Sequence, residues 1–246
     1  MRIGVLSDIH SNVFALESVL EDLQHRDVDA IVDLGDIVYG PIAPRATCEL
    51  LQEQSIKHVQ GNQDRMLHEV KDPEIANNPT LQLMLDELST DQLTWLKALP
   101  YDLYLEDDVY LCHGSPRSDT DYLLEDISGG TPRVKEDSAI LKMLGNVTAP
   151  LILCGHTHVP RIVELSTGQI VVNAGSVGLP AYRDDLPEVY RMENFSHHAN
   201  YSIVDKRSVG WCIEQIRVPY DFGRALEMVR SNQRENWVRL LEEGRA

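Results

Sequence analysis

Residues 2–10 of this chain read RIGVLSDIH, a short apolar run that ends in an aspartate and a histidine. Residues 3–6 have the length and composition of a buried β-strand, and Asp8 and His10 come directly after it. Further apolar runs end in metal-ligand side chains in the same way: Gly35-Asp36, Gly61-Asn62-Gln63-Asp64, His113-Gly114 and Gly155-His156-Thr157-His158. Because each strand sets where its following loop begins, we expect these side chains to converge on one site.

The donor atoms of these segments are a mixture of carboxylate and amide oxygens with imidazole nitrogens. This mixture suits a mid-row divalent metal better than magnesium or calcium alone. The candidate ligands are Asp8, His10, Asp36, Asn62, His113, His156 and His158. They are too many for one tetrahedral zinc and match two ions that share a bridging carboxylate, which is an arrangement used for hydrolysis. Taken alone, the Gly-Asp and Gly-Asn pairs would be equally typical of turns.

The first half of the chain alternates strand-like and helix-like segments. Apolar runs at residues 3–6, 30–34 and 56–59 are separated by helical patterns at 14–23 and 44–54. This rhythm is typical of parallel strands with helical crossovers. Hairpins are predicted over 101–112 and 161–173, and one amphipathic helix over 222–241. We therefore expect an α/β fold of two packed sheets with helices outside, in a single domain that spans residues 1–246.

The order of the ligand segments resembles that of the calcineurin-like metallophosphoesterase superfamily, whose pattern is DxH, GD, GNH(D/E), a separate His and GHxH. The similarity runs from Arg2 to about Gly178 and includes the Asn-Ala-Gly-Ser-Val-Gly run that starts at Asn173. The resemblance implies a four-layer αββα sandwich of two mixed sheets flanked by helices. It also implies two divalent ions, for which manganese is our first expectation and iron, zinc, nickel or cobalt are alternatives.

The resemblance further divides the ligands between the two ions. Asp8, His10 and His158 would hold one metal, while Asn62, His113 and His156 would hold the other, with Asp36 as the bridge. A water between the metals would then drop in pKa and attack phosphorus.

One position departs from the family pattern, because Gln63 stands where many members have a histidine after Gly-Asn. Glutamine donates hydrogen bonds but cannot deliver a proton near neutral pH. We expect Asp36, Asn62, Gln63 and Asp64 to form the catalytic set, with Asp64 either orienting its neighbour or capping the following helix. The chain resembles a bacterial and archaeal subgroup of small phosphodiesterases that lacks this histidine. Hydrolysis would then favour good leaving groups; weak or absent activity is the other consequence.

Two residues are candidates for substrate contact: Tyr39 by stacking and Arg183 by its charge on phosphate, with ordinary surface packing as the alternative. The function expected first is a phosphodiesterase that hydrolyses a small phosphate ester. Alternatives are a hydrolase of dinucleoside polyphosphates or other nucleotides, and a non-catalytic scaffold for protein contacts, as in the retromer subunit of this superfamily.

The net charge of −17 argues against a dedicated nucleic-acid surface, since affinity for nucleic acid comes mainly from Lys and Arg on phosphates. A small phosphate ester stays compatible, because divalent cations reverse the field locally. No apolar stretch is long enough to span a membrane, and the N-terminal residues lack the layout of a signal peptide. We therefore expect a cytoplasmic location, no membrane partner and four cysteines that act as small hydrophobic residues. A homo-oligomer is compatible with the sequence.

Overall fold

The first sheet of the computed structural model has the strand order β14-β13-β1-β2-β3. Its strands are β1 (Arg2–Leu6), β2 (Ala30–Asp33), β3 (Ile56–His58), β13 (Ala199–Arg207) and β14 (Gly210–Val218). β1, β2 and β3 are parallel, and β13 pairs antiparallel to β1 and to β14. The structure describes residues 1–186 and 188–246, apart from the side chains of residues 72, 74 and 76.

The second sheet has the order β4-β5-β8-β10-β9 and is also mixed. It consists of β4 (Asp102–Leu105), β5 (Val109–Cys112), β8 (Leu151–Cys154), β9 (Arg161–Glu164) and β10 (Ile170–Asn173). β5, β8 and β10 are parallel, while β4–β5 and β9–β10 are the two hairpins expected from the sequence.

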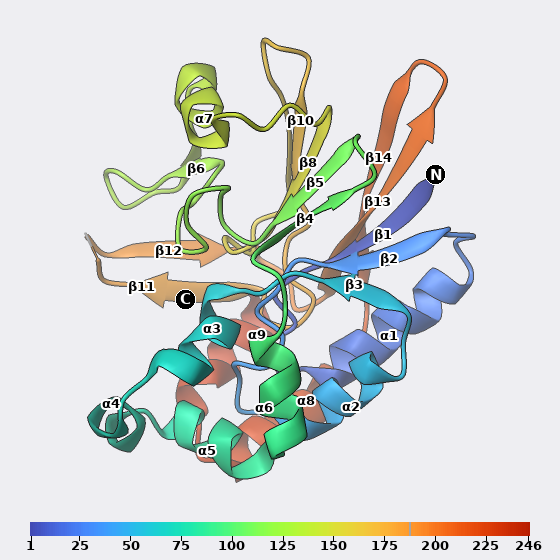
Figure 1. Cartoon of the computed structure of the whole chain (residues 1–246). Coiled ribbons are helices and arrows are strands. Elements are labelled where there is room, and N and C mark those ends of the chain that lie inside the picture. Colours follow the sequence, from blue (N-terminus) through green and yellow to red (C-terminus); the bar gives the residue numbers. More distant parts are fainter. Residues whose placement is uncertain (187) are drawn as a thin grey trace.

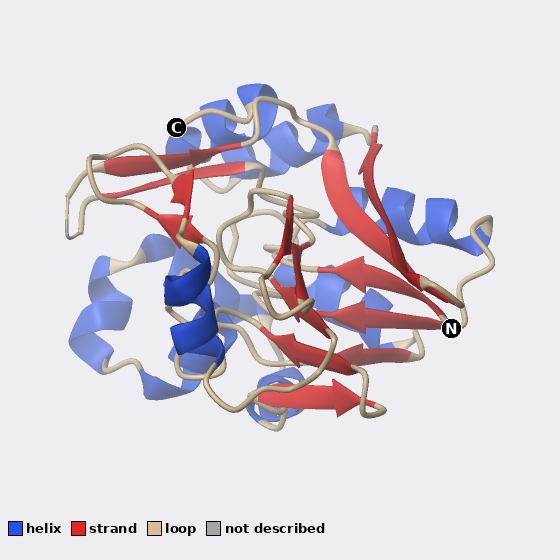
Figure 2. Ribbon diagram, turned by 90° about the horizontal axis from the view of Figure 1, so that it is seen from above, coloured by secondary structure: helices blue, strands red, loops and turns tan. Residues whose placement is uncertain are grey.

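Helices cover the outer faces of the two sheets unequally (Figures 1 and 2). The first sheet faces a large helical layer, and the second faces α7 (Asp137–Leu144). The helical layer contains α1 (Val13–Gln24), α2 (Pro44–Gln52), α3 (Asn62–Glu69), α4 (Asp72–Asn77), α5 (Pro79–Glu87), α6 (Thr90–Lys97), α8 (Phe222–Ser231), the 3-10 turn η1 (Glu235–Trp237) and α9 (Val238–Glu243). Two short ribbons complete the described part of the fold: β6 (Glu125–Asp126) with β7 (Arg133–Val134), and β11 (Ala181–Asp184) with β12 (Tyr190–Glu193). The four-layer αββα sandwich is thus confirmed.

The core between the sheets explains why the strands read as continuous apolar runs. Val5 and Val32 of the first sheet pack in one cluster with Leu111 and Leu153 of the second, and all four are fully buried. Leu6, on the opposite face of β1, is buried in the helical layer. Strands covered on both faces need apolar residues at successive positions rather than at alternate ones.

The C-terminal segment differs from the single helix predicted over residues 222–241. It divides into α8, η1 and α9, with Gln233 in the left-handed region at φ 57°. Asn232 lies at the break and donates a hydrogen bond from Nδ2 to the carbonyl of Pro41 at 2.8 Å. The break turns the chain so that Trp237 packs near the rings of Tyr39 and His10. Among the described residues, no helix is long and apolar enough to cross a lipid bilayer.

Candidate metal centre

The first group of candidate ligands lies where the loops after β1 and β8 meet. Asp8, His10 and His158 each offer one ligand atom, and these atoms lie within 4.8 Å of one another. Nε2 of His158 is 3.2 Å from Oδ1 of Asp8 and 3.1 Å from Nε2 of His10. The three side chains are buried, so an ion among them would be shielded from bulk water.

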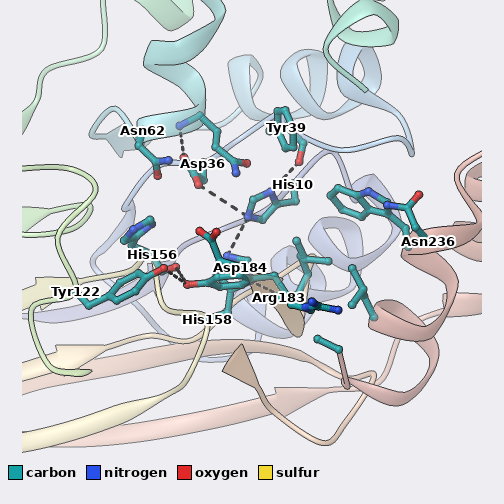
Figure 3. Close-up of a pocket in the computed structure, with 16 residues that line it drawn as sticks. His10, Asp36, Tyr39, Asn62, Tyr122, His156, His158, Arg183, Asp184 and Asn236 are labelled. Carbon is teal, nitrogen blue, oxygen red and sulfur yellow. Dashed lines mark hydrogen bonds and ion pairs between the residues drawn. The ribbon is translucent and has the colours of Figure 1, made fainter. Parts of the chain in front are cut away.

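The second group lies beside the first and comes from the loops after β2, β5 and β8 and from the start of α3. Asp36, His113 and His156 again place one ligand atom each within 4.8 Å of the others. The amide of Asn62 joins them, with Oδ1 3.0 Å from Nε2 of His113. All seven residues selected from the sequence are therefore brought together, and Figure 3 shows His10, Asp36, Asn62 and His156 around one centre.

Asp36 lies between the two groups. Its Oδ2 is 3.4 Å from Nε2 of His113 and 4.0 Å from Nε2 of His10. Its Oδ1 accepts a hydrogen bond from the backbone N–H of Gln63 at 2.9 Å. One carboxylate thus faces both groups at once, as a bridging ligand would have to.

Backbone carbonyls set the orientation of each imidazole. Nδ1 contacts a carbonyl oxygen at 2.5–2.8 Å in three rings, pairing His10 with Tyr39, His113 with Leu34 and His158 with Leu179. In His156 it is Nε2 that lies 3.3 Å from the carbonyl of Thr120. A carbonyl oxygen accepts only from an N–H, so in the neutral form of each ring the opposite nitrogen carries the lone pair that can bind a metal ion.

The carboxylate of Asp8 provides a test of whether this site fits a cation. Oδ2 accepts hydrogen bonds from Oγ of Ser7 at 2.6 Å and from the backbone N–H of His156 at 3.0 Å. Oδ1 is buried and has no hydrogen-bond partner in the described structure. A buried carboxylate oxygen without a donor is costly unless a cation satisfies it, so the residues present fit divalent metal ions.

Electrostatics favour the neutral form of two of the four imidazoles, those of His10 and His156. Burial and the neighbouring imidazoles of His158 and His113 lower the pKa values of His10 and His156 to about 4. Burial also disfavours the charged form of His113, but Asp36 outweighs it and raises the pKa of His113 to about 10. For Asp36 itself, burial acts upward and the His113 charge downward, with a net lowering of the pKa. His10, His156 and Asp36 are therefore held in the protonation states that bind metal, whereas His113 carries a proton that a metal ion would have to displace.

The loops that carry the ligands have an unusual backbone. Positive φ angles occur at Asp8 (54°), His10 (49°), Asp36 (56°), His156 (68°) and His158 (59°). Residues other than glycine rarely adopt this left-handed region, and such positions concentrate at functional sites.

Glycines beside the ligands let the loops approach each other closely. A Cβ on Gly61 would collide with the backbone nitrogen of Asp36, and one on Gly155 would collide with the side chain of Ser7. The glycines of the sequence segments are therefore needed for contact between loops.

Asp64 and Gln63 take different positions at the start of α3. The two oxygens of Asp64 accept hydrogen bonds from the backbone N–H groups of Asp36 (2.8 Å), Ile37 (2.9 Å) and Gly61 (3.0 Å). Asp64 is fully buried, and burial together with the Asp36 carboxylate raises its pKa to about 8, against the effect of these donors. Its contacts favour the capping role. Gln63 lines the cavity over the ligands, and its buried Oε1 has no hydrogen-bond partner among the described residues.

A cavity of about 580 Å³ opens over the candidate ligands and contains both predicted substrate contacts. Tyr39 lies on its wall, where its hydroxyl accepts a hydrogen bond from Nδ2 of Asn78 at 3.0 Å. Arg183 lies on β11 at the rim; its side chain is 51% exposed and pairs with Asp185 at 3.0 Å. Figure 3 shows Tyr39 and Arg183 on different sides of the cavity.

A second cavity of about 430 Å³ adjoins the first. The two cavities share Asn62, His156, Tyr122 and Asp184 as lining residues. The ring of Tyr122 lies against that of His156, with centroids 4.8 Å apart, and its hydroxyl hydrogen-bonds to that of Tyr190. Tyr122 is thus a fixed wall between two spaces that meet at the second ligand group.

Several lining residues were not anticipated from the sequence. They are Tyr122, Leu179, Tyr182, Asp184, Asn236, Trp237 and Leu240. Asn236 and Trp237 reach the cavity because the C-terminal segment folds back over it, and Tyr182 and Asp184 because of the β11–β12 ribbon. No local motif marks these residues.

Comparisons with known proteins agree with this geometry. Residues 1–193 match the calcineurin-like phosphoesterase superfamily domain. The chain is 28% identical over 260 residues to MJ0912, an uncharacterized protein of Methanocaldococcus jannaschii, with 96% of this chain and 95% of that protein covered. It is also similar to a solved structure of a metallophosphoesterase from Sphaerobacter thermophilus. That similarity has a TM-score of 0.77 at 26% identity and covers 99% of this chain and 100% of the other.

Proposed function

Because this chain belongs to the calcineurin-like phosphoesterase superfamily and is thus a metal-dependent hydrolase of phosphate esters, we propose that it is a dinuclear phosphodiesterase acting on a small ester. The observation that carries the proposal is the position of Asp36, whose Oδ2 faces His113 of one ligand group and His10 of the other. Two divalent ions in this arrangement would lower the pKa of a water and neutralise the phosphate oxygens.

The protein's own residues have distinct tasks in this mechanism. Asp8, His10 and His158 would hold the first ion, Asn62, His113 and His156 would hold the second, and Asp36 would be shared between them. Gln63 lies in the cavity with an amide that donates hydrogen bonds to a phosphate oxygen but delivers no proton. The departing oxygen therefore leaves largely unprotonated, which favours esters with acidic leaving groups. Asp64 positions Asp36 and Gly61 by accepting their backbone N–H groups.

The two cavities favour a diester over a monoester. A phosphodiester carries two organic substituents, and the second ligand group opens to a separate cavity on each side of Tyr122. We propose that each cavity receives one substituent. Tyr39 offers an aromatic face to one of them, and Arg183 offers its charge at the rim.

The hydrolysis of dinucleoside polyphosphates has less support. A polyphosphate chain needs several cationic groups along its length. Among the described residues, Arg183 is the one Lys or Arg that lines the larger cavity, and it is paired with Asp185. Lys135 in the smaller cavity directs its ammonium to backbone carbonyls, including that of Glu125 at 2.7 Å. A scaffold without catalysis has less support still, because none of the seven candidate ligands is replaced.

Manganese is the metal we propose, because the site mixes oxygen donors with imidazoles. Residues 1–246 are proposed to form one domain, since β13 and β14 pair into the same sheet as β1. The cytoplasmic location and the homo-oligomer stay predictions.

Crystals grown with manganese test the dinuclear centre directly. Anomalous scattering should reveal two ions about 3.5 Å apart on either side of Asp36. The same protein should hydrolyse bis-p-nitrophenyl phosphate faster than p-nitrophenyl phosphate. A single ion, or ions remote from Asp36, would contradict the dinuclear centre, and faster turnover of the monoester would contradict the diesterase assignment.

A further inference from the structure

An ion pair outside the ligand set joins two parts of the chain that serve the second ligand group. Arg65 of α3 contacts Asp119 in a bidentate manner, with Nε 2.6 Å from Oδ2 and Nη2 3.0 Å from Oδ1. The Asp119 side chain is 8% exposed, whereas that of Arg65 is 35% exposed. Paired planar groups of this kind fix both distance and angle, unlike a single point-charge contact.

Each partner is directly linked to a candidate ligand. Arg65 lies one helical turn after Asn62, the first residue of α3. Asp119 precedes Thr120, whose carbonyl contacts Nε2 of His156 at 3.3 Å and so directs the other ring nitrogen to the centre. The ion pair therefore links the helix that carries Asn62 to the loop that contacts the imidazole of His156.

The loop that carries Asp119 is rigid enough to transmit this constraint. Oγ of Ser115 accepts the backbone N–H groups of Arg117 and Ser118, both at 3.1 Å, and donates to Asp121 at 2.8 Å. The Ser115 N–H donates to the carbonyl of Ser118 at 2.8 Å. These hydrogen bonds close a turn on both sides of Asp119 and Thr120 and restrict the positions of these two residues.

We propose that Arg65 and Asp119 are positioning residues for the second metal ion and do not act on the first. This inference rests on the proposed dinuclear function. The first group is oriented by other side-chain contacts: Ser7 for Asp8, the Tyr39 carbonyl for His10 and the Leu179 carbonyl for His158. Asp8 also accepts the backbone N–H of His156, a contact that does not depend on the orientation of the His156 ring. None of these contacts involves α3 or residues 114–121. Loss of the ion pair should therefore weaken one metal site selectively.

The variants Arg65→Lys and Asp119→Asn test this selectivity. Lysine keeps the charge and loses the two-point contact, and asparagine keeps the size and loses the charge. Removal of a group that hydrogen-bonds a metal ligand directly changes metal affinity by about 10- to 100-fold, and this ion pair acts one contact further out, at the lower end of that range. We expect the dissociation constant of Mn²⁺ for the second site to rise about tenfold. The constant for the first site should stay within about twofold.

Glu69→Gln is the matched control. Glu69 is the other carboxylate paired with Arg65, one turn further along α3, and its side chain is 59% exposed. Removal of this charge changes the electrostatics of Arg65 but leaves the contact with Asp119 in place. Both manganese sites of this variant should be those of the wild type.

Calorimetric Mn²⁺ titration of the metal-free protein measures the affinities, and anomalous peak heights at limiting manganese identify the weakened site. Loss of the peak beside Asn62 alone, with the peak beside Asp8 kept, is the expected result. Equal affinities in the wild type and in Arg65→Lys or Asp119→Asn would overturn the inference, as would equal weakening of both sites together with a lower melting temperature. A wild type that binds one ion would overturn the dinuclear function and this inference with it. If Arg65→Lys does not fold, Asp119→Asn decides alone.

Discussion

Asp64 offers a quantitative test of how the bridging carboxylate is held in place. Its carboxylate is buried and accepts three backbone N–H groups, those of Asp36, Ile37 and Gly61. Asp64→Ala would leave all three donors buried without an acceptor, at about 1–3 kcal/mol each. The loss in unfolding free energy should therefore be about 3–9 kcal/mol, a large part of the total stability of a domain. Asp64→Asn keeps one oxygen, so its loss should be about 1–3 kcal/mol.

Urea unfolding of the metal-free protein at pH 7 measures both changes. Asp91→Asn is the matched control, because it removes an exposed carboxylate from the first turn of α6 and should change stability by less than about 0.5 kcal/mol. If Asp64→Ala also stays within about 0.5 kcal/mol of the wild type, the three hydrogen bonds do not hold the Asp36 loop. That result would contradict the capping role of Asp64.

Three further predictions concern the bridge, the leaving group and alkaline pH. Asp36→Asn should lower the metal content and abolish turnover of bis-p-nitrophenyl phosphate while the protein stays folded, because Asp36 faces both ligand groups. A variant with normal kcat and metal content would mean that Asp36 is only a turn residue. Across substituted phenyl diesters, the rate should fall steeply as the pKa of the leaving phenol rises, and Gln63→His should flatten this dependence; a flat series in the wild type, with chemistry rate-limiting, would show that another group supplies the proton. Burial raises the pKa of Tyr220 to about 12, so the stability it contributes is complete below pH 10, its unfolded value, and is lost between about pH 10 and 12. Over that range Tyr220→Phe should lose about 2–3 kcal/mol less unfolding free energy than the wild type, and identical pH profiles in urea unfolding would contradict the assignment.

The α/β fold of two packed sheets and the convergence of the candidate ligands could be predicted because both depend on local features of the sequence. Apolar runs that are buried on both faces identify the strands, and a ligand directly after a strand has little freedom in where it lies. The glycines add to this, since Gly61 and Gly155 stand where the backbone of one loop meets another. Strand and loop together therefore define most of the site before any tertiary contact is known.

The walls of the cavities could not be predicted in this way. Trp237 reaches the cavity because the C-terminal helix breaks near Asn232, whereas the apolar pattern continues through the break. Tyr122 lies in a polar loop and is placed by its contacts with Tyr190 and His156, which are distant in sequence. Asp64 was compatible with two roles, and the positions of three N–H groups distinguish between them.

The candidate ligands in the left-handed region face two opposing requirements. Metal binding requires a side chain at these positions, whereas the stability of the fold would be greater with glycine. Glycine would adopt the φ angles of Asp8, His10, Asp36, His156 and His158 without the steric cost that a side chain brings. At about 1 kcal/mol for each residue, the set amounts to roughly 5 kcal/mol, comparable with the whole stability of a small domain. A homologue that no longer needs catalysis would therefore gain unfolding free energy if glycine replaced the ligands at these positions. Glycine there in a homologue of the same fold would be a readable sign that hydrolysis had been abandoned.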